Sequence, residues 1–206
     1  MLVGILDLEM GNLRSVFNAF YTLGYEVEII KDIAQFDHIS HLVIPGVGSY
    51  HKAVYHLDGK NFRSPIRKFA ERGKPLLGIC LGMHLLSEYG EEGGRNQGLG
   101  LIGGYVTKLA STPNFPIPHV GWNTIKFREH HPVFEGVKYG IDCYFVHSYH
   151  FVCDNQKYIY GTTDYGKEFV SIIVGKNVIG FQFHPEKSQS NGLKLLENFC
   201  NWDGVC

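Results

Sequence analysis

The chain has little surplus charge, because its 19 lysines and arginines are balanced by 20 aspartates and glutamates. It has no run of basic residues to neutralise the phosphates of nucleic acid or an anionic membrane. With only 8 prolines, 44% hydrophobic residues and no low-complexity stretch among its 206 residues, disordered and fibrous classes are excluded. The composition therefore predicts a globular protein that binds neither nucleic acid nor membrane.

Long hydrophobic runs are missing as well. The longest, such as residues 76–81, have the length of a strand and fall far short of the ~20 residues that a membrane span needs. The opening MLVGILDLE lacks a basic segment and a small-residue cleavage site, so it indicates a first strand and not an export signal. We therefore expect a soluble chain in the cytoplasm.

Cysteine is scarce and forms no CxxC pair among its five occurrences. An odd number without such pairs argues against a disulfide framework and a zinc site. Several histidines show no ligand spacing with acidic neighbours, and we expect them on the solvated surface: His38, His41, His51, His56, His130 and His131. No metal site and no cofactor are predicted.

The first half of the chain alternates short apolar runs with helical patterns. Strands are predicted over 2–6, 26–30, 41–44 and 76–79, and helices over 13–23 and 65–72. Asn12 is placed to cap the first of these helices. Alternation of this kind is typical of a parallel sheet with helices on its faces.

The second half is richer in strands joined by short polar turns. Strands are predicted over 105–109, 123–127, 144–146, 158–162 and 168–174, with a hairpin at 175–177 leading into 178–183. A closing helix is predicted over 191–201. We therefore predict one α/β domain over residues 1–206. Its central, largely parallel sheet is flanked by helices, and additional antiparallel strands lie in the C-terminal half.

Cys80 lies in the segment LLGICLGMHLL, between an apolar strand and a helical pattern. Its GxCxG context is the sulfur counterpart of the GxSxG nucleophile elbow. Gly78 and Gly82 fit this motif, because the sharp turn strains the nucleophile's backbone and leaves no space for a neighbouring side chain. The motif alone leaves two interpretations open, a catalytic thiol or a small core residue.

His184 and Glu186 stand in FQFHPEKSQ, directly after a predicted strand. A nucleophilic thiol needs a base, and the base needs a carboxylate that fixes its tautomer. Taken alone, the tripeptide is equally compatible with a solvated turn. Together with Cys80 it favours a catalytic Cys, His and Glu set.

The segment IPGVGSY contributes Gly46 and Gly48 at the end of another strand. Glycines there allow the backbone to present amide groups, as an oxyanion hole requires. By itself, PGVG indicates only a turn.

Six segments in this order resemble the class I glutamine amidotransferases, which have a flavodoxin-like fold: DLEMGN, PGVGSY, GICLGMHLL, PHVGWN, YFVHSYH and FQFHPEKSQ. The resemblance spans residues 2–199, nearly the whole chain. PHVGWN and YFVHSY narrow it to the glutaminase subunits of imidazole glycerol phosphate synthases, which supply ammonia in histidine biosynthesis.

This resemblance implies an activity and a set of roles. Cys80 would attack the side-chain amide of L-glutamine, His184 would carry the proton to the departing ammonia, and Glu186 would orient the imidazole. The remaining implied roles are backbone amides for the oxyanion at Val47 and Leu81, and substrate contacts at Gly46, Gly48, His84, Ser148 and Tyr149.

The resemblance also implies a partner. A (β/α)₈-barrel cyclase subunit would form a heterodimer with this chain, receive its ammonia, and make imidazole glycerol phosphate and AICAR. Trp122 and Asn123 resemble the family's docking surface, although packing of Trp122 in the core is the alternative.

Two positions depart from the family pattern. His84 stands where glutamine is usual, and Glu9 where glycine is common. These departures keep alternatives open: a paralogous subunit that feeds a sugar amidotransferase in surface polysaccharide synthesis, or a non-catalytic scaffold subunit. A stand-alone thiol hydrolase or peptidase is a further alternative.

Overall fold

A computed structural model describes residues 1–205. Within them, five parallel strands form the centre of a larger mixed sheet: β1 (Leu2–Leu6), β2 (Glu26–Ile30), β3 (His41–Ile44), β4 (Leu76–Ile79) and β13 (Val178–Phe181). Their spatial order is β2-β1-β3-β4-β13, the 2-1-3-4-5 order of flavodoxin-like sheets. The expected parallel sheet is therefore confirmed.

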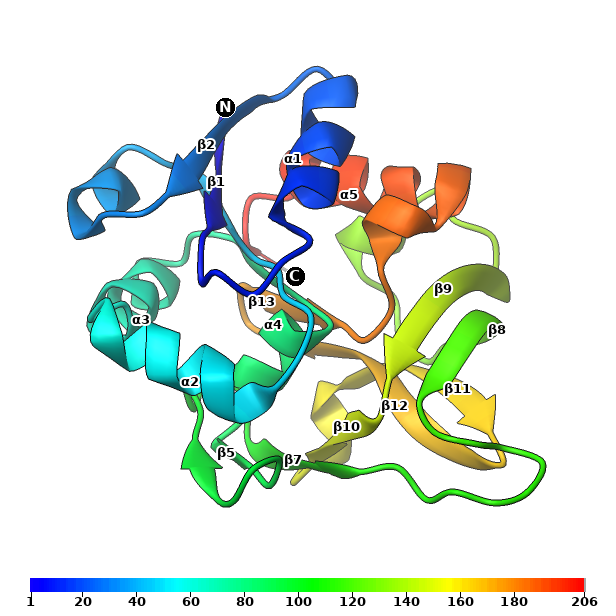
Figure 1. The fold of residues 1–206 in the computed structure, drawn as a ribbon. Helices are drawn as coiled ribbons and strands as arrows, with labels where there is room; N and C mark the ends of the chain where they lie inside the picture. The colour runs from blue at the N-terminus through cyan, green and yellow to red at the C-terminus, as the bar shows by residue number, and fades with distance from the viewer. Residues whose placement is uncertain (206) are drawn as a thin grey trace.

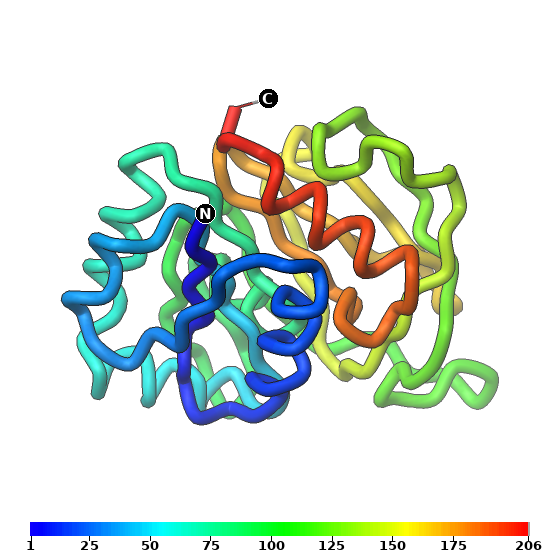
Figure 2. The backbone as a smooth tube through the Cα atoms, turned by 90° about the horizontal axis from the view of Figure 1, so that it is seen from above, coloured from blue at the N-terminus to red at the C-terminus, as the bar shows by residue number. Residues whose placement is uncertain are grey.

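Four of the parallel strands, β1, β3, β4 and β13, are buried on both faces because helices cover each side. Val3 and Ile5 pack into one core with α1 (Leu13–Thr22) and α5 (Gln189–Asn201), and Leu6 into another with α2 (Tyr50–Gly59) and α3 (Arg63–Glu71). Figure 1 and Figure 2 show α1 and α5 side by side, with α2 and α3 across the sheet. These buried faces explain why the strands lack polar alternation.

The second half extends the sheet with antiparallel strands, as predicted. β12 (Lys167–Gly175) pairs with β13 by the expected hairpin and continues the sheet through β10 (Tyr149–Cys153) to β7 (Gly104–Lys108). β11 (Ile159–Tyr165), β8 (His119–Phe127) and β9 (Ile141–His147) branch from β12 (Figure 1). The remaining short elements are α4 (Leu81–Leu85), β5 (Tyr89–Gly90), β6 (Asn96–Gln97), η1 (Ile33–Asp37), η2 (Pro132–Phe134), η3 (Gln156–Tyr158) and η4 (Pro185–Lys187).

Helix α2 and strand β10 have no counterpart in the sequence prediction, and neither do the short elements β5, β6 and η1 to η4. Helix α2 follows the PGVG turn and buries Tyr50, Ala53, Val54 and Leu57, a spacing of three and four that is typical of a helix. Strand β10 follows β9 after a single intervening residue, Ser148. The predicted strand at 123–127 also starts earlier, at position 119.

Three local expectations are wrong. Asn12 precedes α1 with φ +64° but makes no side-chain capping bond to it, because its amide is used elsewhere. His41 and His131 are buried rather than solvated. Each makes a hydrogen bond inside the fold: His41 Nε2 donates to the Trp202 carbonyl oxygen, and His131 Nδ1 accepts the Val133 amide.

Two further findings concern the thiols and the helices. Cys143 and Cys200 are buried and Cys153 is half-buried, all as free thiols, while Cys206 lies outside the described residues. Among residues 1–205, no helix is both long and apolar enough to cross a membrane.

Candidate active site

Cys80 sits at a sharp turn between β4 and α4, at the carboxyl edge of the parallel strands. Its φ of 52° and ψ of −107° are strained for a residue with a side chain. A Cβ on Gly82 would lie 1.6 Å from the Ile44 oxygen, and one on Gly78 would lie 2.6 Å from the Gly82 oxygen. Only glycine fits at these two positions, which confirms the expected elbow geometry.

His184 and Glu186 reach the same edge because β13 lies directly beside β4. Ile79 and Phe181 are paired in register at the ends of these strands, so the residues after each strand meet. His184 Nδ1 lies 2.7 Å from Glu186 Oε1, and both side chains are fully buried. Since a carboxylate can only accept, Nδ1 carries the proton and Nε2 is left for a second partner.

Asn12 completes this cluster from the loop after β1. Its Nδ2 donates to Glu186 Oε1 at 2.6 Å and lies 3.3 Å from His184 Nδ1. The left-handed φ of Asn12, which asparagine tolerates better than most residues, turns its amide inward. The residues around Asn12 predict only a helix cap, because no local signal links it to position 186.

The electrostatics of the cluster favour a charged imidazole. Burial alone would lower the pKa of His184, but attraction to the Cys80 sulfur and the hydrogen bond that Nδ1 donates to Glu186 raise it to about 10. Burial opposes ionisation of Glu186 too, yet its bonds to His184 and Asn12 lower the pKa of that carboxyl. The arrangement therefore favours an imidazolium at His184 beside a carboxylate at Glu186.

A cavity of about 310 Å³ opens beside Cys80, at the lower end of the ~300–1,000 Å³ of small-molecule sites. Six predicted site residues line it: Gly48, Cys80, Leu81, His84, Ser148 and Tyr149. Gly46 lies behind it, where an added Cβ would be 3.3 Å from the Leu81 side chain.

Five further residues line this cavity without having been predicted for it: Ser49, Glu92, Pro118, Val146 and His147. The Glu92 carboxylate accepts the backbone amide of Tyr50 at 2.7 Å, at the positive end of helix α2. No motif around position 92 marks it in the sequence, so only the fold brings this negative charge to the cavity.

His84 lies one helical turn beyond Cys80 and is held by a side chain from the other catalytic segment. Its Nε2 donates to Gln182 Oε1 at 2.7 Å, and Gln182 Nε2 points to the Cys80 sulfur at 3.9 Å. Burial lowers the pKa of His84 to about 4, so the imidazole is neutral near pH 7. With Nε2 protonated, Nδ1 is an acceptor.

The two amides expected to bind an oxyanion are in different states. Leu81 follows the nucleophile at the start of α4, where the first amides of a helix have no partner within it. The Val47 amide instead donates to the Met10 carbonyl at 3.1 Å. In this conformation the Val47 hydrogen is therefore engaged outside the cavity.

The two residues expected at a partner interface face opposite sides of strand β8. Trp122 is 49% exposed, and Val120 beside it on the same face is 55% exposed. Asn123 points to the other side, where its Nδ2 donates to the Asp164 carbonyl at 2.9 Å. Trp122 is thus a surface residue and not part of the core.

Glu9, the second departure from the family pattern, has φ +58°, a conformation that favours glycine. Its carboxylate is 57% exposed and pairs with Lys60 at 2.8 Å. The added charge is therefore neutralised at the surface.

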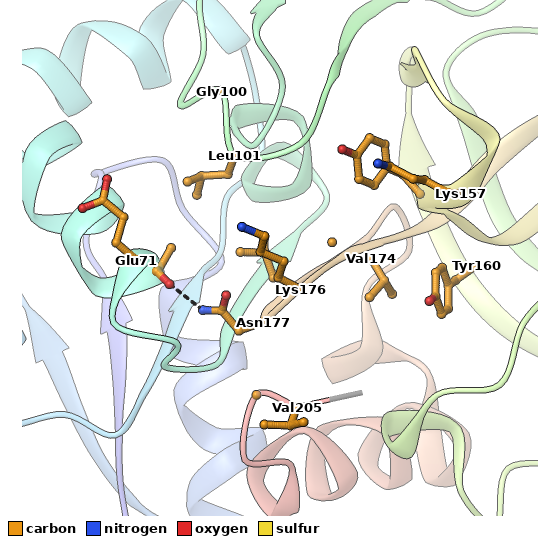
Figure 3. A pocket seen from close by; sticks show the side chains of 14 residues that line it. Glu71, Gly100, Leu101, Lys157, Tyr160, Val174, Lys176, Asn177 and Val205 are labelled. Carbon is orange, nitrogen blue, oxygen red and sulfur yellow. Dashed lines mark hydrogen bonds between the residues drawn. The ribbon is translucent and has the colours of Figure 1, made fainter.

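A larger cavity, of about 820 Å³, lies at the opposite edge of the sheet. Its lining includes Asn177 and Val178, where β13 begins (Figure 3). Asn177 donates to the Ala70 carbonyl at 2.9 Å, which ties the hairpin before β13 to α3. Because parallel strands share one direction, this cavity is separated from Cys80 by the length of β4 and β13.

Comparisons with known proteins agree with this geometry. The family described as glutamine amidotransferase class-I matches residues 4–202, and the chain belongs to this family. An imidazole glycerol phosphate synthase subunit HisH from Sulfurimonas denitrificans is 45% identical over 204 residues, covering 98% of each chain. The HisH subunit of Aquifex aeolicus is 46% identical over 196 residues, covering 95% of this chain and 94% of the relative.

Solved structures of lower identity share the fold. The structure of PurLQS from Thermotoga maritima superposes with a TM-score of 0.78 at 20% identity, covering 97% of both chains. A glutamine amidotransferase structure gives a TM-score of 0.77 at 19% identity, covering 98% of this chain and 99% of the other. The mixed α/β architecture is therefore that of the glutamine amidotransferases.

Proposed function

We propose that this chain, acting as one domain over residues 1–206, is the glutaminase subunit of an imidazole glycerol phosphate synthase. It hydrolyses L-glutamine to L-glutamate and ammonia for histidine biosynthesis in the cytoplasm. Full-length identity of 45% to a relative of that name supports the assignment. The observation that carries the chemistry is the buried His184 and Glu186 pair beside the strained Cys80.

In this mechanism the Cys80 thiolate attacks the side-chain carbonyl carbon of glutamine. The imidazolium of His184 gives its Nε2 proton to the departing nitrogen, so ammonia leaves and a glutamyl thioester remains. His184, now neutral, takes a proton from water, whose oxygen attacks the thioester and releases glutamate. Glu186 and Asn12 hold the imidazole with Nε2 toward the sulfur throughout.

The tetrahedral intermediate carries an oxyanion for which Leu81 is the available donor. Val47 becomes the second donor only when its bond to the Met10 carbonyl breaks. Loss of one oxyanion donor typically costs ~2.7 to 4 kcal/mol in the transition state. A change in the PGVG loop that frees the Val47 amide would therefore accelerate hydrolysis.

The substrate's polar ends would be held by the cavity lining. Glu92 supplies a carboxylate for the α-ammonium group, and the backbone near Gly48, Ser148 and Tyr149 supplies polar contacts. His84 contributes Nδ1 as an acceptor, in place of the amide that is usual in the family. Gly46 keeps the loop close to Leu81.

Ammonia released into water would be protonated and lose its nucleophilicity, so a partner must cover the site. We propose a (β/α)₈-barrel cyclase subunit that forms a heterodimer with this chain and uses the ammonia to make imidazole glycerol phosphate and AICAR. The exposed Trp122 and Val120 on β8 offer an apolar anchor of the kind found at interface hot spots.

Glutamate release, measured with and without the cyclase subunit from the same organism, tests this function. We expect stimulated release and imidazole glycerol phosphate as the aminated product. Cys80→Ala should abolish release, while Cys200→Ala, at another buried thiol, should retain it. Stimulated hydrolysis by Cys80→Ala would refute the nucleophile, and an aminated sugar would assign the chain to polysaccharide synthesis instead.

A further inference from the structure

Three side chains join strand β8 to the substrate cavity through consecutive hydrogen bonds. His147 Nδ1 lies 2.8 Å from the Tyr149 carbonyl oxygen. His119 Nδ1 lies 3.0 Å from His147 Nε2, and Asn123 Nδ2 lies 3.3 Å from His119 Nε2. His119 and His147 face each other directly in the β8 and β9 ladder, where cross-strand side chains are closest.

The donors and acceptors available give this series of hydrogen bonds a single direction. A carbonyl only accepts, so His147 Nδ1 must donate to Tyr149, which leaves Nε2 of a neutral imidazole as an acceptor. His119 Nδ1 must then donate to it, and His119 Nε2 accepts from Asn123. The amide of Asn123 is fixed in turn, because its oxygen accepts the Thr124 amide at 2.8 Å.

Both imidazoles are held neutral by their surroundings. His119 is 2% exposed and His147 5%. Burial lowers the pKa of His119 to about 4 and that of His147 well below its usual value. The neighbouring His119, His84 and His150 lower the pKa of His147 further. Tyr165 and Phe145 stack on the His119 ring, with centroids at 4.0 and 4.9 Å. Protonation of either imidazole would turn its Nε2 from an acceptor into a donor, and the hydrogen bond that this nitrogen accepts would be lost.

The two ends of this hydrogen-bonded series of side chains lie at the two places that matter for the proposed reaction, the substrate cavity and the exposed face of β8. His147, Ser148 and Tyr149 line the cavity beside Cys80. At the other end, Asn123 sits on the inner face of the strand whose outer face exposes Trp122. A shift of β8 on contact at its outer face would therefore be transmitted to the cavity backbone.

We propose that His119 and His147 are positioning residues that fix the Ser148 and Tyr149 backbone for glutamine and link it to strand β8. The link to the cyclase rests on the function proposed above. Neither side chain exchanges a proton with the substrate. Their role is to hold one fixed arrangement of hydrogen bonds, with both rings protonated at Nδ1, between the exposed face of β8 and the cavity.

Matched substitutions in the complex with the cyclase subunit test the proposal. His147→Phe keeps the ring but removes the donor to Tyr149, whereas His147→Asn keeps a donor near the Nδ1 position. We expect His147→Phe and His119→Phe to raise the KM for glutamine about tenfold, because each leaves a buried group unpaired. His147→Asn should restore the KM to within about threefold, and His131→Asn, at a buried histidine outside the cavity, should not change it.

The link to β8 has its own readout. The ratio of glutaminase rates with and without cyclase should fall in His119→Phe more than kcat of the isolated chain does. An unchanged KM in folded His147→Phe, or equal KM values for His147→Phe and His147→Asn, would overturn the positioning role. A raised KM with an unchanged stimulation ratio would overturn the link.

A measurement that does not depend on activity separates this inference from the proposed function. Nitrogen NMR of the histidine rings should show His147 and His119 both protonated at Nδ1 and unprotonated at Nε2 at pH 7. If these tautomers are present but glutamine is not hydrolysed, the proposed function is refuted and the positioning inference is not. A proton on His147 Nε2 would refute the inference, whatever the activity.

Discussion

The Asn12 amide donates a 2.6 Å hydrogen bond to the Glu186 carboxylate, across 174 positions of sequence. The same oxygen, Oε1, accepts from His184 at 2.7 Å. The loop after the first strand thus holds the carboxylate that follows the last strand. Glu186 Oε2 is buried and has no partner within residues 1–205, so Asn12 is the described side chain, besides His184, that fixes this group.

Asn12→Gly should lower kcat for glutamine hydrolysis about tenfold to a hundredfold with little change in KM. A hydrogen bond to a charged group is worth ~1.5 to 3 kcal/mol, and glycine accepts the left-handed backbone without strain. Steady-state kinetics of the complex measure the effect. Asn61→Gly is the matched control, since Asn61 has φ +56° on the exposed surface; equal kcat in both variants would contradict a role for Asn12.

The His184 ring should remain protonated far above the pH at which an ordinary histidine loses its charge. Its pKa is raised to about 10, against the effect of burial, by Cys80 and Glu186. Because the pKa is raised, the stabilisation it brings is complete below about pH 6.5 and is lost as the pH rises through about 10. An NMR titration measures it. Cys80→Ala should lower the pKa, and a neutral ring at pH 7 in the wild type would rule out the ion pair.

Trp122→Ala should weaken binding of the cyclase subunit about 30-fold, since a central tryptophan anchor contributes ~2 kcal/mol or more. Titration calorimetry with the purified cyclase measures the dissociation constant. Tyr55→Ala serves as control, because Tyr55 is 71% exposed on α2, away from β8. If both substitutions leave the affinity unchanged, the docking surface lies elsewhere.

His131 should make the fold less stable as the pH falls. Burial lowers its pKa to about 4, so between about pH 6.5 and 4 the unfolded chain binds a proton that the folded chain does not. His131→Asn keeps an acceptor for the Val133 amide and removes the titration. Between pH 7 and 5 the variant should lose about 2 kcal/mol less of its unfolding free energy than the wild type.

Urea unfolding at the two pH values measures this difference. His130→Asn, at the exposed neighbouring position, should follow the wild type. Equal pH dependence in His131→Asn and wild type would show that His131 is protonated in the folded state.

Local sequence patterns were enough for most of the fold and for the nucleophile. The strand at 76–79, the elbow glycines and Cys80 lie within a few residues of one another, so their geometry is a local property of the chain. Asn12, Glu92 and Gln182 could not be found in this way. Each acts through a partner far away in sequence, and the local patterns around them indicate only a cap, a loop and a strand end.

The sequence alone determined the alternation of strands and helices and the order of the motifs, because backbone preference and apolar periodicity act over a few residues. The tertiary structure alone decided that β13 lies beside β4 and that His184 and Cys80 therefore lie at the same edge of the sheet. It also decided that Asn123 faces inward while Trp122 faces outward, and that the Val47 amide is engaged by Met10. Such contacts depend on how strands far apart in the chain are ordered and registered in the sheet, and no local preference encodes that order.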